Sequence, residues 1–471
     1  MKIPLLGGYS KRRSVNQDAQ RTVNLYLETD TAEPESGSAL YMVPGKTEFA
    51  AIGNGPIRAM ISHNHLVIAI SGNEVYRINE TGAGTRIGTI TLGGTKRVAL
   101  SANRNHVIAV TGQNAYIITG SNVTAVTDPD FAGSYLVDYL DGYFVFAIPD
   151  SQQFYVSAIN DGSSFDALDF AQAESNLDDI VGLIVDHREL WLFGSQSIEI
   201  WYNSGATDFP LARRDGAVLE VGCAAPQSIS KADNTIFWLG RNAHGQGLVY
   251  RADQYNPQII SNRGIEYEIG QMPDIEKATA FSYQQSGHTF YVLSFPESMR
   301  TYVYDASIQD PELAWHVRET YAQGRDRANC HVFAFGKHLV GDYASNQVWE
   351  LSDTTYTDGG LPICWERTTP RIVQDYKRVM FRSLTINMER GVGLVSGHGS
   401  DPSIYLDWSD DGGHTWCSKR SASMGKIGAF KPSITFNRLG CSRDRVFRIT
   451  GSCPVKTVIL GAYLDAEAGD H

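Results

Sequence analysis

The sharpest short pattern in this 471-residue chain lies in residues 409–416. It matches the Asp-box pattern Ser-x-Asp-x-Gly-x-Thr-Trp at every position, through Ser409, Asp411, Gly413, Thr415 and Trp416. In such a turn the Asp carboxylate accepts hydrogen bonds from backbone amides, Gly adopts a conformation that other residues resist, and Trp packs the turn onto its sheet. The pattern therefore predicts a β-hairpin turn with a structural role.

The Asp box raises the question of glycosidase chemistry, because sialidase propellers carry such boxes. There they are structural and recur once per blade, whereas this chain has one full copy. A glycosidase needs two carboxylates around the scissile bond, and sialic acid would require an arginine cluster as well. The candidates are Asp178, Asp179, Glu199, Arg213 and Arg214. Their spacing singles none of them out, so we interpret them as surface or turn residues and predict no catalytic residue.

His63 and His65 stand two positions apart and would point to one side of a strand, as metal ligands can. No further candidate ligand lies at a spacing typical of a metal site, so we interpret both as polar strand-edge residues and predict no metal. We find no Gly-rich phosphate loop, no Gly-x-Ser-x-Gly elbow and no Cys/His zinc pattern, and we predict no cofactor. We expect six cysteines to be reduced, small core residues: Cys223, Cys330, Cys364, Cys417, Cys441 and Cys453.

A repeated hairpin organises most of the chain around these residues. Residues 66–78 read as an apolar run, a small turn with Gly, and a second run in which large and polar side chains alternate. Six further copies follow, and the first strands of all seven begin at residues 67, 107, 145, 190, 236, 290 and 338. A propeller blade is a four-stranded sheet of about 40 to 50 residues whose inner strands are the most buried. The period predicts a β-propeller of seven or six blades over residues 50–362; the alternative is a run of β-meanders that form sandwiches.

The segments on either side differ from the repeats. Residues 1–49 contain one clear strand, at 22–27, which we expect to pair with the last blade and close the ring. The alternative for this segment is an arm that docks on a neighbouring subunit. Residues 363–471 predict a β-sandwich that carries the Asp-box hairpin, from strands that alternate cleanly at 379–386, 403–408, 445–450 and 457–464. The predicted fold class is therefore all-β, a propeller followed by a sandwich.

The overall charge bears on possible partners. A formal net charge of −12 with a pI near 5.5 argues against a general nucleic-acid binder, which needs clustered Lys and Arg. A polyanion could still pass along such a surface without being held. The N-terminus has no apolar core of signal-peptide length, and no stretch nears eighteen apolar residues. We therefore expect a protein that is made and kept in a soluble compartment, with no membrane partner.

Four groups of residues, in order along the chain, resemble one known family. They are Val23-Asn24-Leu25 with Pro44-Gly45-Lys46-Thr47, Ser197-Ile198-Glu199 with Ser204-Gly205-Ala206-Thr207, Tyr302-Val303-Tyr304-Asp305-Ala306-Ser307 with Trp315, and Arg445-Val446-Phe447-Arg448-Ile449 with Pro454-Val455. Through them the chain resembles the packaged-DNA stabilisation proteins of short-tailed bacteriophages, also called tail accessory or nozzle proteins. The order of the groups carries the resemblance, and the full Asp box departs from it.

The resemblance implies a structural protein of the virion tail that is assembled in the host cytoplasm. It implies a homohexamer below the portal and its adaptor protein, which extends the DNA channel, stabilises the packaged DNA and anchors the tail needle or plug; tailspikes are a further partner. DNA would pass through the lumen without specific binding, since an acidic surface repels phosphate. The competing hypothesis is a propeller glycosidase or carbohydrate-binding module acting on cell-surface glycan. A glycosidase should be active as a monomer, whereas a nozzle protein should form a six-fold ring or bind adaptor-capped portals.

Overall fold

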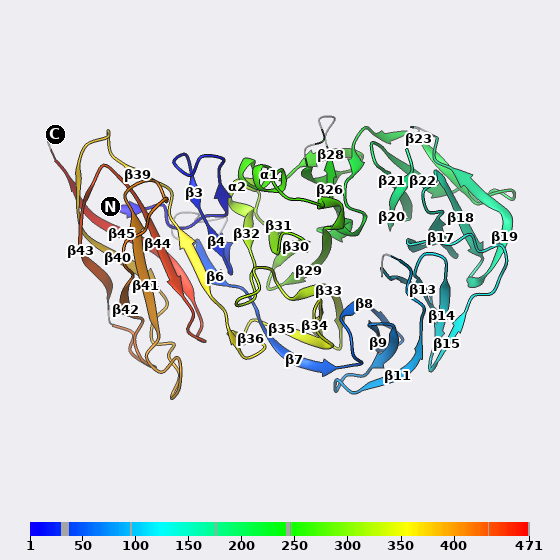
Figure 1. Cartoon of the computed structure of the whole chain (residues 1–471), viewed down its shortest axis with the longest axis horizontal. Helices are drawn as coiled ribbons and strands as arrows, with labels where there is room; N and C mark the ends of the chain where they lie inside the picture. The colour runs from blue at the N-terminus through cyan, green and yellow to red at the C-terminus, as the bar shows by residue number, and fades with distance from the viewer. Residues whose placement is uncertain are drawn as a thin grey trace.

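The chain folds into two β-structured bodies that lie side by side along its longest axis (Figure 1). A computed structural model describes residues 1–29, 37–94, 97–174, 176, 178–241, 245, 247–431 and 433–469. Strands account for 54% and helices for 4% of the described residues, in agreement with the all-β prediction. The body at the right of Figure 1 is a β-propeller and the body at the left is a β-sandwich. Within the described ranges, no helix is long and apolar enough to cross a membrane.

The propeller consists of seven blades, each built on a four-stranded antiparallel sheet. In the first four blades the strands follow one another in chain order. These strands are β8 (Ile57–His63), β9 (Leu66–Ser71), β10 (Glu74–Ile78) and β11 (Gly84–Thr89); β12 (Ala99–Ala102), β13 (Val107–Val110), β14 (Ala115–Thr119) and β15 (Asn122–Ala125); β16 (Val137–Leu140), β17 (Tyr143–Ala147), β18 (Gln153–Ala158) and β19 (Asp161–Gln172); and β20 (Ile180–Asp186), β21 (Glu189–Gly194), β22 (Ile198–Asn203) and β23 (Leu211–Leu219).

The remaining three blades carry short helices and additional strands. Blade 5 contains β24 (Gly222–Cys223), η1 (Pro226–Ser228), β25 (Ser230–Ala232), β26 (Thr235–Arg241), β27 (Gly247–Asp253) and β28 (Asn256–Ile259), and it is followed by α1 (Arg263–Ile269) and η2 (Ile275–Lys277). Blade 6 contains β29 (Thr279–Gln285), β30 (His288–Phe295), β31 (Arg300–Asp305), α2 (Pro311–Ala314) and β32 (Trp315–Val317). Blade 7 contains β33 (Ala328–Ala334), β34 (Lys337–Asp342), β35 (Gln347–Ser352) and β7 (Gly45–Ala51), and its sheet continues into β36 (Thr357–Asp358) and β37 (Leu361–Pro362).

All seven predicted hairpins are the two middle strands of a blade, so the propeller has seven blades and not six. Both faces of these strands are buried, which explains the continuous apolar runs. In β9, Val67 packs with Leu339 of blade 7, whereas the neighbouring Ile68 packs with Val107 of blade 2. The alternative of β-meanders forming sandwiches is wrong for this region.

The ring is closed by a different strand from the one that we predicted. Gly45–Ala51 (β7) pairs antiparallel with β35 and is the fourth strand of blade 7. The predicted strand, residues 22–27, instead divides into β4 (Thr22–Val23) and β5 (Leu25–Glu28) and joins the sandwich. Its apolar character reflects burial between the two bodies. An outer strand such as β7, with Thr47 and Glu48 exposed, needs no such run.

The sandwich is built from both ends of the chain. One sheet contains β43 (Ile434–Ser442), β40 (Val379–Met388), β45 (Val458–Ala468), β6 (Ala39–Met42) and β5, with β1 (Lys2–Ile3) on β45. The other contains β4, β38 (Trp365–Thr368), β44 (Asp444–Gly451), β41 (Ser403–Ser409) and β42 (Arg420–Ser423), with β39 (Ile372–Val373) on β44. A small hairpin of β2 (Ser10–Lys11) and β3 (Ala19–Gln20) lies between β1 and β4 in the chain.

The four predicted sandwich strands correspond to β40, β41, β44 and β45, so this prediction is confirmed. Strands β1, β4, β5 and β6 of the N-terminal segment belong to the sandwich sheets, whereas residues 45–49 belong to blade 7. The six cysteines are free, and Cys330 and Cys453 pack half-buried against the core, so the expectation of core residues fails clearly only for the exposed ones. Cys223 is buried, whereas Cys364 and Cys441 are exposed.

Candidate functional site

One continuous sheet connects the propeller to the sandwich. Strand β4 pairs on one side with β32 of blade 6, where Val23 lies beside Val317, and on the other with β38, where it lies beside Glu366. The sheet therefore runs unbroken from β29 to β42. Domains joined by small polar contacts move relative to each other by default. Backbone hydrogen bonds across this boundary make the two bodies one stiff unit.

We call the pairing of β32, β4 and β38 the joint. Asn24, directly after β4, adds side-chain hydrogen bonds to it. Its side-chain amide donates to the backbone oxygens of Glu319 (2.9 Å) and Cys364 (2.8 Å), and its Oδ1 accepts from the Glu319 amide (2.9 Å). The residue has a φ of 53°, a conformation that Asn tolerates better than most residues. Asn24 thus binds the end of blade 6 and the start of the sandwich at once.

Arg367 of β38 fixes the N-terminal segment from within the sandwich. Its guanidinium is fully buried and donates to five acceptors, the backbone oxygens of Leu5, Gly8 and Arg21, Thr22 Oγ1 and Gln20 Oε1. Burial lowers the pKa of Arg367 to about 9, so the cation persists at neutral pH. The acceptors replace the water that this cation loses, and they order the first 22 residues around it.

Two consecutive glycines permit this close approach. A Cβ at Gly7 would lie 2.7 Å from Nη2 of Arg367, and one at Gly8 would lie 2.7 Å from the backbone oxygens of Glu312 and Leu313. Real Cβ atoms do not approach backbone oxygens this closely, so the segment requires glycine at position 8, whereas a side chain at position 7 would push against the Arg367 guanidinium.

A histidine links β5 to blade 6. His288 Nδ1 lies 2.6 Å from Asp305 Oδ2, and its Nε2 lies 3.6 Å from Glu28 Oε2. Burial alone would lower the pKa of His288, but the contacts with Asp305 and Glu28 raise it above its usual value. Tyr26 packs edge-on against His288 and Phe290. The contacts attach the sandwich to a second strand of the same blade.

A buried ion cluster locks the ring where β7 closes it. Lys46 Nζ lies 3.0 Å from Asp326 Oδ1 and 3.7 Å from Asp358 Oδ1, and Arg327 Nε lies 3.0 Å from Asp358 Oδ1. Thr320 donates to Asp358 Oδ2 at 2.7 Å. Burial would raise the pKa of Asp326, but Lys46 and further hydrogen bonds hold it below its usual value. The cluster joins β7, the segment before blade 7 and the segment after it.

The Asp-box residues form a compact turn between β41 and β42. Ser409 Oγ donates to Asp411 Oδ1 (2.6 Å), and Asp411 accepts from the Thr415 amide and from Thr415 Oγ1 (2.6 Å). Trp416 Nε1 donates to the Gly413 oxygen at 3.2 Å. The hydrogen bonds from Ser409 and Thr415 hold the pKa of Asp411 well below its usual value. The five residues of the pattern thus lie in one turn, and its structural role stays a prediction.

This turn also touches the N-terminal segment. A Cβ at Gly412, which has a φ of 76°, would lie 2.2 Å from Asn16 Oδ1, and one at Gly413 would lie 3.3 Å from the Ala19 side chain. The Arg448 guanidinium lies 3.9 Å from the centre of the Trp416 ring. The Asp box therefore supports the loop before β3, at the same side of the sandwich as the joint.

Replacing Asp411 with Ala is expected to loosen this turn without unfolding the sandwich. The turn is exposed, so the loss of its hydrogen bonds should cost only about 1 kcal/mol of unfolding free energy. Cleavage between residues 409 and 417 should become faster in limited proteolysis. Asp411→Asn keeps one acceptor oxygen, so its cleavage rate should lie between those of the wild type and Asp411→Ala. An unchanged cleavage rate in Asp411→Ala would contradict a structural role for the carboxylate.

The glycosidase candidates do not converge on one site. Asp178 accepts from the Gln196 amide (2.6 Å) and Ser197 Oγ (3.1 Å), which braces the turn between β21 and β22. Glu199 is buried and accepts from Trp201 Nε1 at 2.9 Å.

The other three candidates are spread across blade 4. Arg214 pairs with Glu189 at 2.5 Å. Asp179 lies at the wall of the axial cavity, whereas Arg213 lies on the outer strand β23. All five positions thus lie in or next to blade 4, but they spread from its inner edge to its outer edge.

The two histidines lie at the turn between β8 and β9. His63 Nε2 lies 3.1 Å from the Asn103 oxygen, a contact between blades 1 and 2, and His65 is exposed in the turn. Over the described part of the chain, no group of three or more His, Cys, Asp or Glu residues could hold a metal ion.

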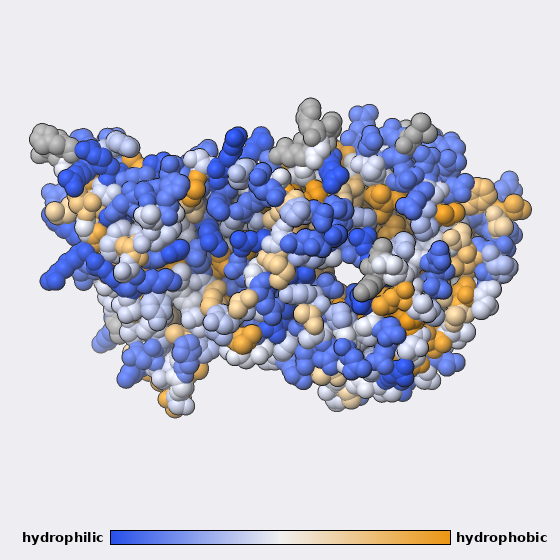
Figure 2. Space-filling view, in the orientation of Figure 1, coloured by the Kyte–Doolittle hydropathy of each residue, from blue (hydrophilic) through white to orange (hydrophobic). Residues whose placement is uncertain are grey.

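All seven blades line an axial cavity of about 590 Å³, blade 5 through η1 and the others through their inner strands and adjoining loops. Figure 2 shows the propeller open at its centre. The charged residues of the wall are Arg58 and Arg97 from blades 1 and 2 and Asp150 and Asp179 beside blades 3 and 4. Arg58 Nε donates to the Gly72 oxygen at 2.7 Å, so this cation is held by its own blade.

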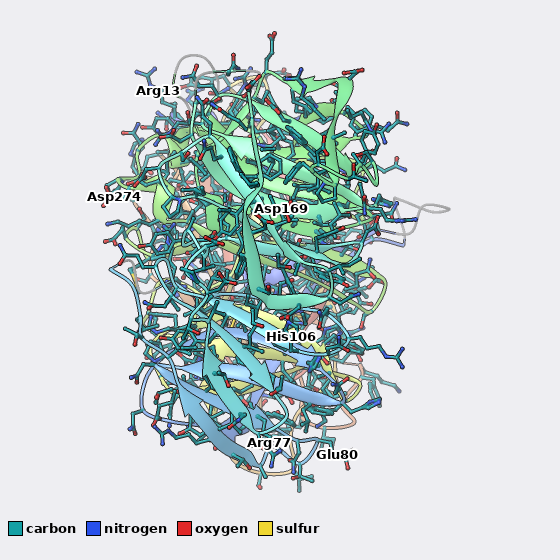
Figure 3. The ribbon with its side chains drawn as sticks, turned by 90° about the vertical axis from the view of Figure 1, so that its right-hand side faces the viewer. Arg13, Arg77, Glu80, His106, Asp169 and Asp274 are labelled. Atoms are coloured by element: carbon teal, nitrogen blue, oxygen red, sulfur yellow. The ribbon has the colours of Figure 1, made fainter. Side chains whose placement is uncertain are left out.

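Charge is distributed unevenly between the two bodies. Residues 50–362 contain 19 Lys and Arg against 35 Asp and Glu, whereas residues 363–471 contain 15 against 11. The formal net charge of −12 is therefore the sum of an acidic propeller and a slightly basic sandwich. Figure 3 faces the outer end of the propeller, where Asp169 lies on β19 near the centre of the view.

The sequence analysis did not identify the residues that build the joint or the buried ion cluster around Lys46. Asn24 and Lys46 stand in groups that carry the family resemblance, which is the signal that could have marked them. The sequence around Arg367 and Asp326 offers no such signal, because a single charged residue in a strand or loop reads as a surface residue.

Two family models match the chain, one after the other. The β-propeller model of bacteriophage P22 Gp10 matches residues 1–356, and the β-sandwich model of bacteriophage P22 Gp10 matches residues 364–467. No curated protein sequence matches the chain.

Several solved propellers resemble the chain in architecture. Virginiamycin B lyase from Staphylococcus aureus is 9% identical with a TM-score of 0.45, and the match covers 63% of this chain and 94% of that one. The Pan2 WD40 domain of Neurospora crassa is 10% identical with a TM-score of 0.43, covering 66% and 96%. Hsv2 of Kluyveromyces lactis is 13% identical with a TM-score of 0.35, covering 63% and 97%. Similarity at this level carries no argument about function.

Proposed function

The chain belongs to the family of bacteriophage P22 Gp10, a tail structural and DNA stabilisation protein, and from this premise we propose that it forms a homohexameric nozzle below the portal and its adaptor. In this role it extends the DNA channel, helps to retain the packaged genome and anchors the tail needle or plug, with tailspikes as further neighbours. Assembly takes place in the host cytoplasm. The ordered match of both family models over residues 1–356 and 364–467 carries the proposal.

Two physical features support it. The acidic propeller would repel phosphate and let DNA slide, so retention must come from a plug and from tight contacts between subunits. The continuous sheet from β29 to β42 makes the chain a stiff unit, which suits a part that bears the pressure of a packaged genome.

Electron cryo-microscopy of the phage particle tests the proposal. Six copies around a DNA channel below the adaptor are the expected result. The purified chain should also bind adaptor-capped portals and leave bare portals free. A monomer at the tail periphery with glycan in the axial cavity would overturn the proposal in favour of a glycan-binding or glycan-cleaving protein.

A further inference from the structure

Two glycine-rich loops form the end of the sandwich that lies opposite the Asp box. They are residues 389–402, between β40 and β41, and residues 424–431, after β42, and we call them the tip loops. Strand β41 begins at the first loop and ends at the Asp box, so the two features lie at opposite ends of one strand. The tip loops lie at the lower left of Figure 1, below β42.

The tip loops expose a cluster of large apolar side chains. The exposed fractions are 87% for Val395, 67% for Phe430, 60% for Ile427 and 41% for Leu394. The loops adjoin each other, since the Gly428 amide donates to the Gly391 oxygen at 3.1 Å. Hydrophobic atoms are visible at this projecting end in Figure 2. Single exposed apolar residues need no explanation, but four in two adjoining loops mark an interaction surface.

Apart from Glu389 and Asp401 at the ends of the first loop, the charged residues of the tip loops are all basic. Arg390, Lys426 and Lys431 lie in or beside them, and no Asp or Glu occurs in residues 390–400 or 412–443. Of the acidic residues at the loop ends, Glu389 pairs with Lys456 at 2.9 Å and Asp401 accepts from Ser423. An apolar and cationic tip therefore stands on a chain whose net charge is −12.

We propose that the tip loops dock on an anionic lipid bilayer. The apolar side chains would enter the boundary between headgroups and acyl chains, while Lys426, Lys431 and Arg390 would lie at the headgroup phosphates. This is a peripheral contact, not a membrane span, and it departs from the sequence-based expectation of no membrane partner.

The shape of the tip favours a bilayer over a protein partner. Protein interfaces of ordinary size need a broad complementary surface, and they are depleted of Lys. The tip is a narrow projection with a high share of glycine, and a deformable bilayer can accept such a projection. The charge pattern agrees, because each cation near an anionic membrane surface adds to binding. The inference goes beyond the proposed function and does not depend on a hexamer.

Sedimentation of the full chain with lipid vesicles tests the inference. We expect binding to phosphatidylcholine vesicles that contain phosphatidylglycerol, weaker binding to phosphatidylcholine alone, and a decrease with added salt. The variants Ile427→Ser/Phe430→Ser and Lys426→Glu/Lys431→Glu should each lose about tenfold or more in vesicle affinity. These side chains are exposed, so both variants should keep the melting temperature of the wild type.

The matched control lies on the outer strand β19. Leu168 and Phe170 are 78% and 46% exposed, but acidic residues surround them. Leu168→Ser/Phe170→Ser should therefore bind vesicles as the wild type does. The inference is overturned if phosphatidylglycerol does not promote binding, or if the tip variants bind as well as the control.

Assembly of the variants into tail particles distinguishes the remaining outcomes. Tip variants that lose vesicle binding but still enter the tail support the lipid contact and leave the proposed function intact. If the wild type does not bind vesicles and the tip variants fail to enter the tail, the tip is a protein interface and the lipid assignment is wrong. A wild-type chain that binds vesicles but never enters a tail would contradict only the proposed function.

Discussion

Replacing Lys46 with Met is expected to lower the free energy of unfolding by about 3 to 5 kcal/mol, because one partner of a buried ion pair is lost and the other charge stays buried. Lys46 Nζ lies 3.0 Å from Asp326 and 3.7 Å from Asp358, and all three side chains are buried. Met keeps the unbranched stem, so the packing of β7 changes little. Urea-induced unfolding, followed by tryptophan fluorescence, measures the loss.

The loss of unfolding free energy in Lys46→Met should depend on pH. In the wild type the pKa of Asp326 is lowered, so its carboxylate contributes stability above the unfolded-state pKa and loses it as the pH falls through the folded-state value. Without Lys46, burial dominates and the pKa of Asp326 should rise above its usual value. The Lys46→Met variant should therefore be least stable relative to wild type at neutral pH and should recover part of the difference in mild acid.

Two control variants distinguish the effect of breaking the buried ion cluster from a general effect of removing a lysine. Adding Asp326→Asn to Lys46→Met removes the stranded charge and should restore a large part of the stability. Lys337→Met breaks the more exposed pair with Glu350 and should change stability little. Equal losses in Lys46→Met and Lys337→Met would mean that the buried cluster does not hold the ring closed.

The propeller was predictable because its signal is local. Each blade buries both faces of its two middle strands, so Val67 and Ile68, which point to opposite neighbours, are both apolar. The closing strand was not predictable by the same signal, since β7 is the fourth strand of blade 7 and exposes Glu48. The strongest apolar run before the repeats belongs to the joint, where burial comes from the sandwich.

The joint itself depends on contacts that no local pattern encodes. Asn24 hydrogen-bonds residues 319 and 364, and Lys46 pairs with Asp326 some 280 positions away. Each of these residues is polar, and a polar residue beside a strand reads as exposed until its partner is known. The Asp box is the exception, because all of its hydrogen-bonding partners lie within eight residues.

Replacing Arg367 with Met should release the N-terminal segment and uncouple the two bodies. The loss leaves five acceptors without this donor, three of them in buried hydrogen bonds, and we expect a cost of about 3 to 5 kcal/mol in unfolding free energy. Because β4 is the strand that joins blade 6 to β38, its release should also split a single unfolding transition into two, one for the sandwich and one for the propeller. Calorimetry measures the transitions, and hydrogen exchange of residues 1–23 should become faster.

Arg367→Lys is the matched control for the charge of this residue. Lys keeps the charge, but its single ammonium cannot reach acceptors that the planar guanidinium spans from Leu5 to Thr22, so we expect a loss close to that of Met. Near wild-type stability in Arg367→Lys would show that charge alone suffices. A single unfolding transition with unchanged exchange in Arg367→Met would show that the propeller and the sandwich are held together elsewhere, with Asn24 and His288 as the next contacts to change.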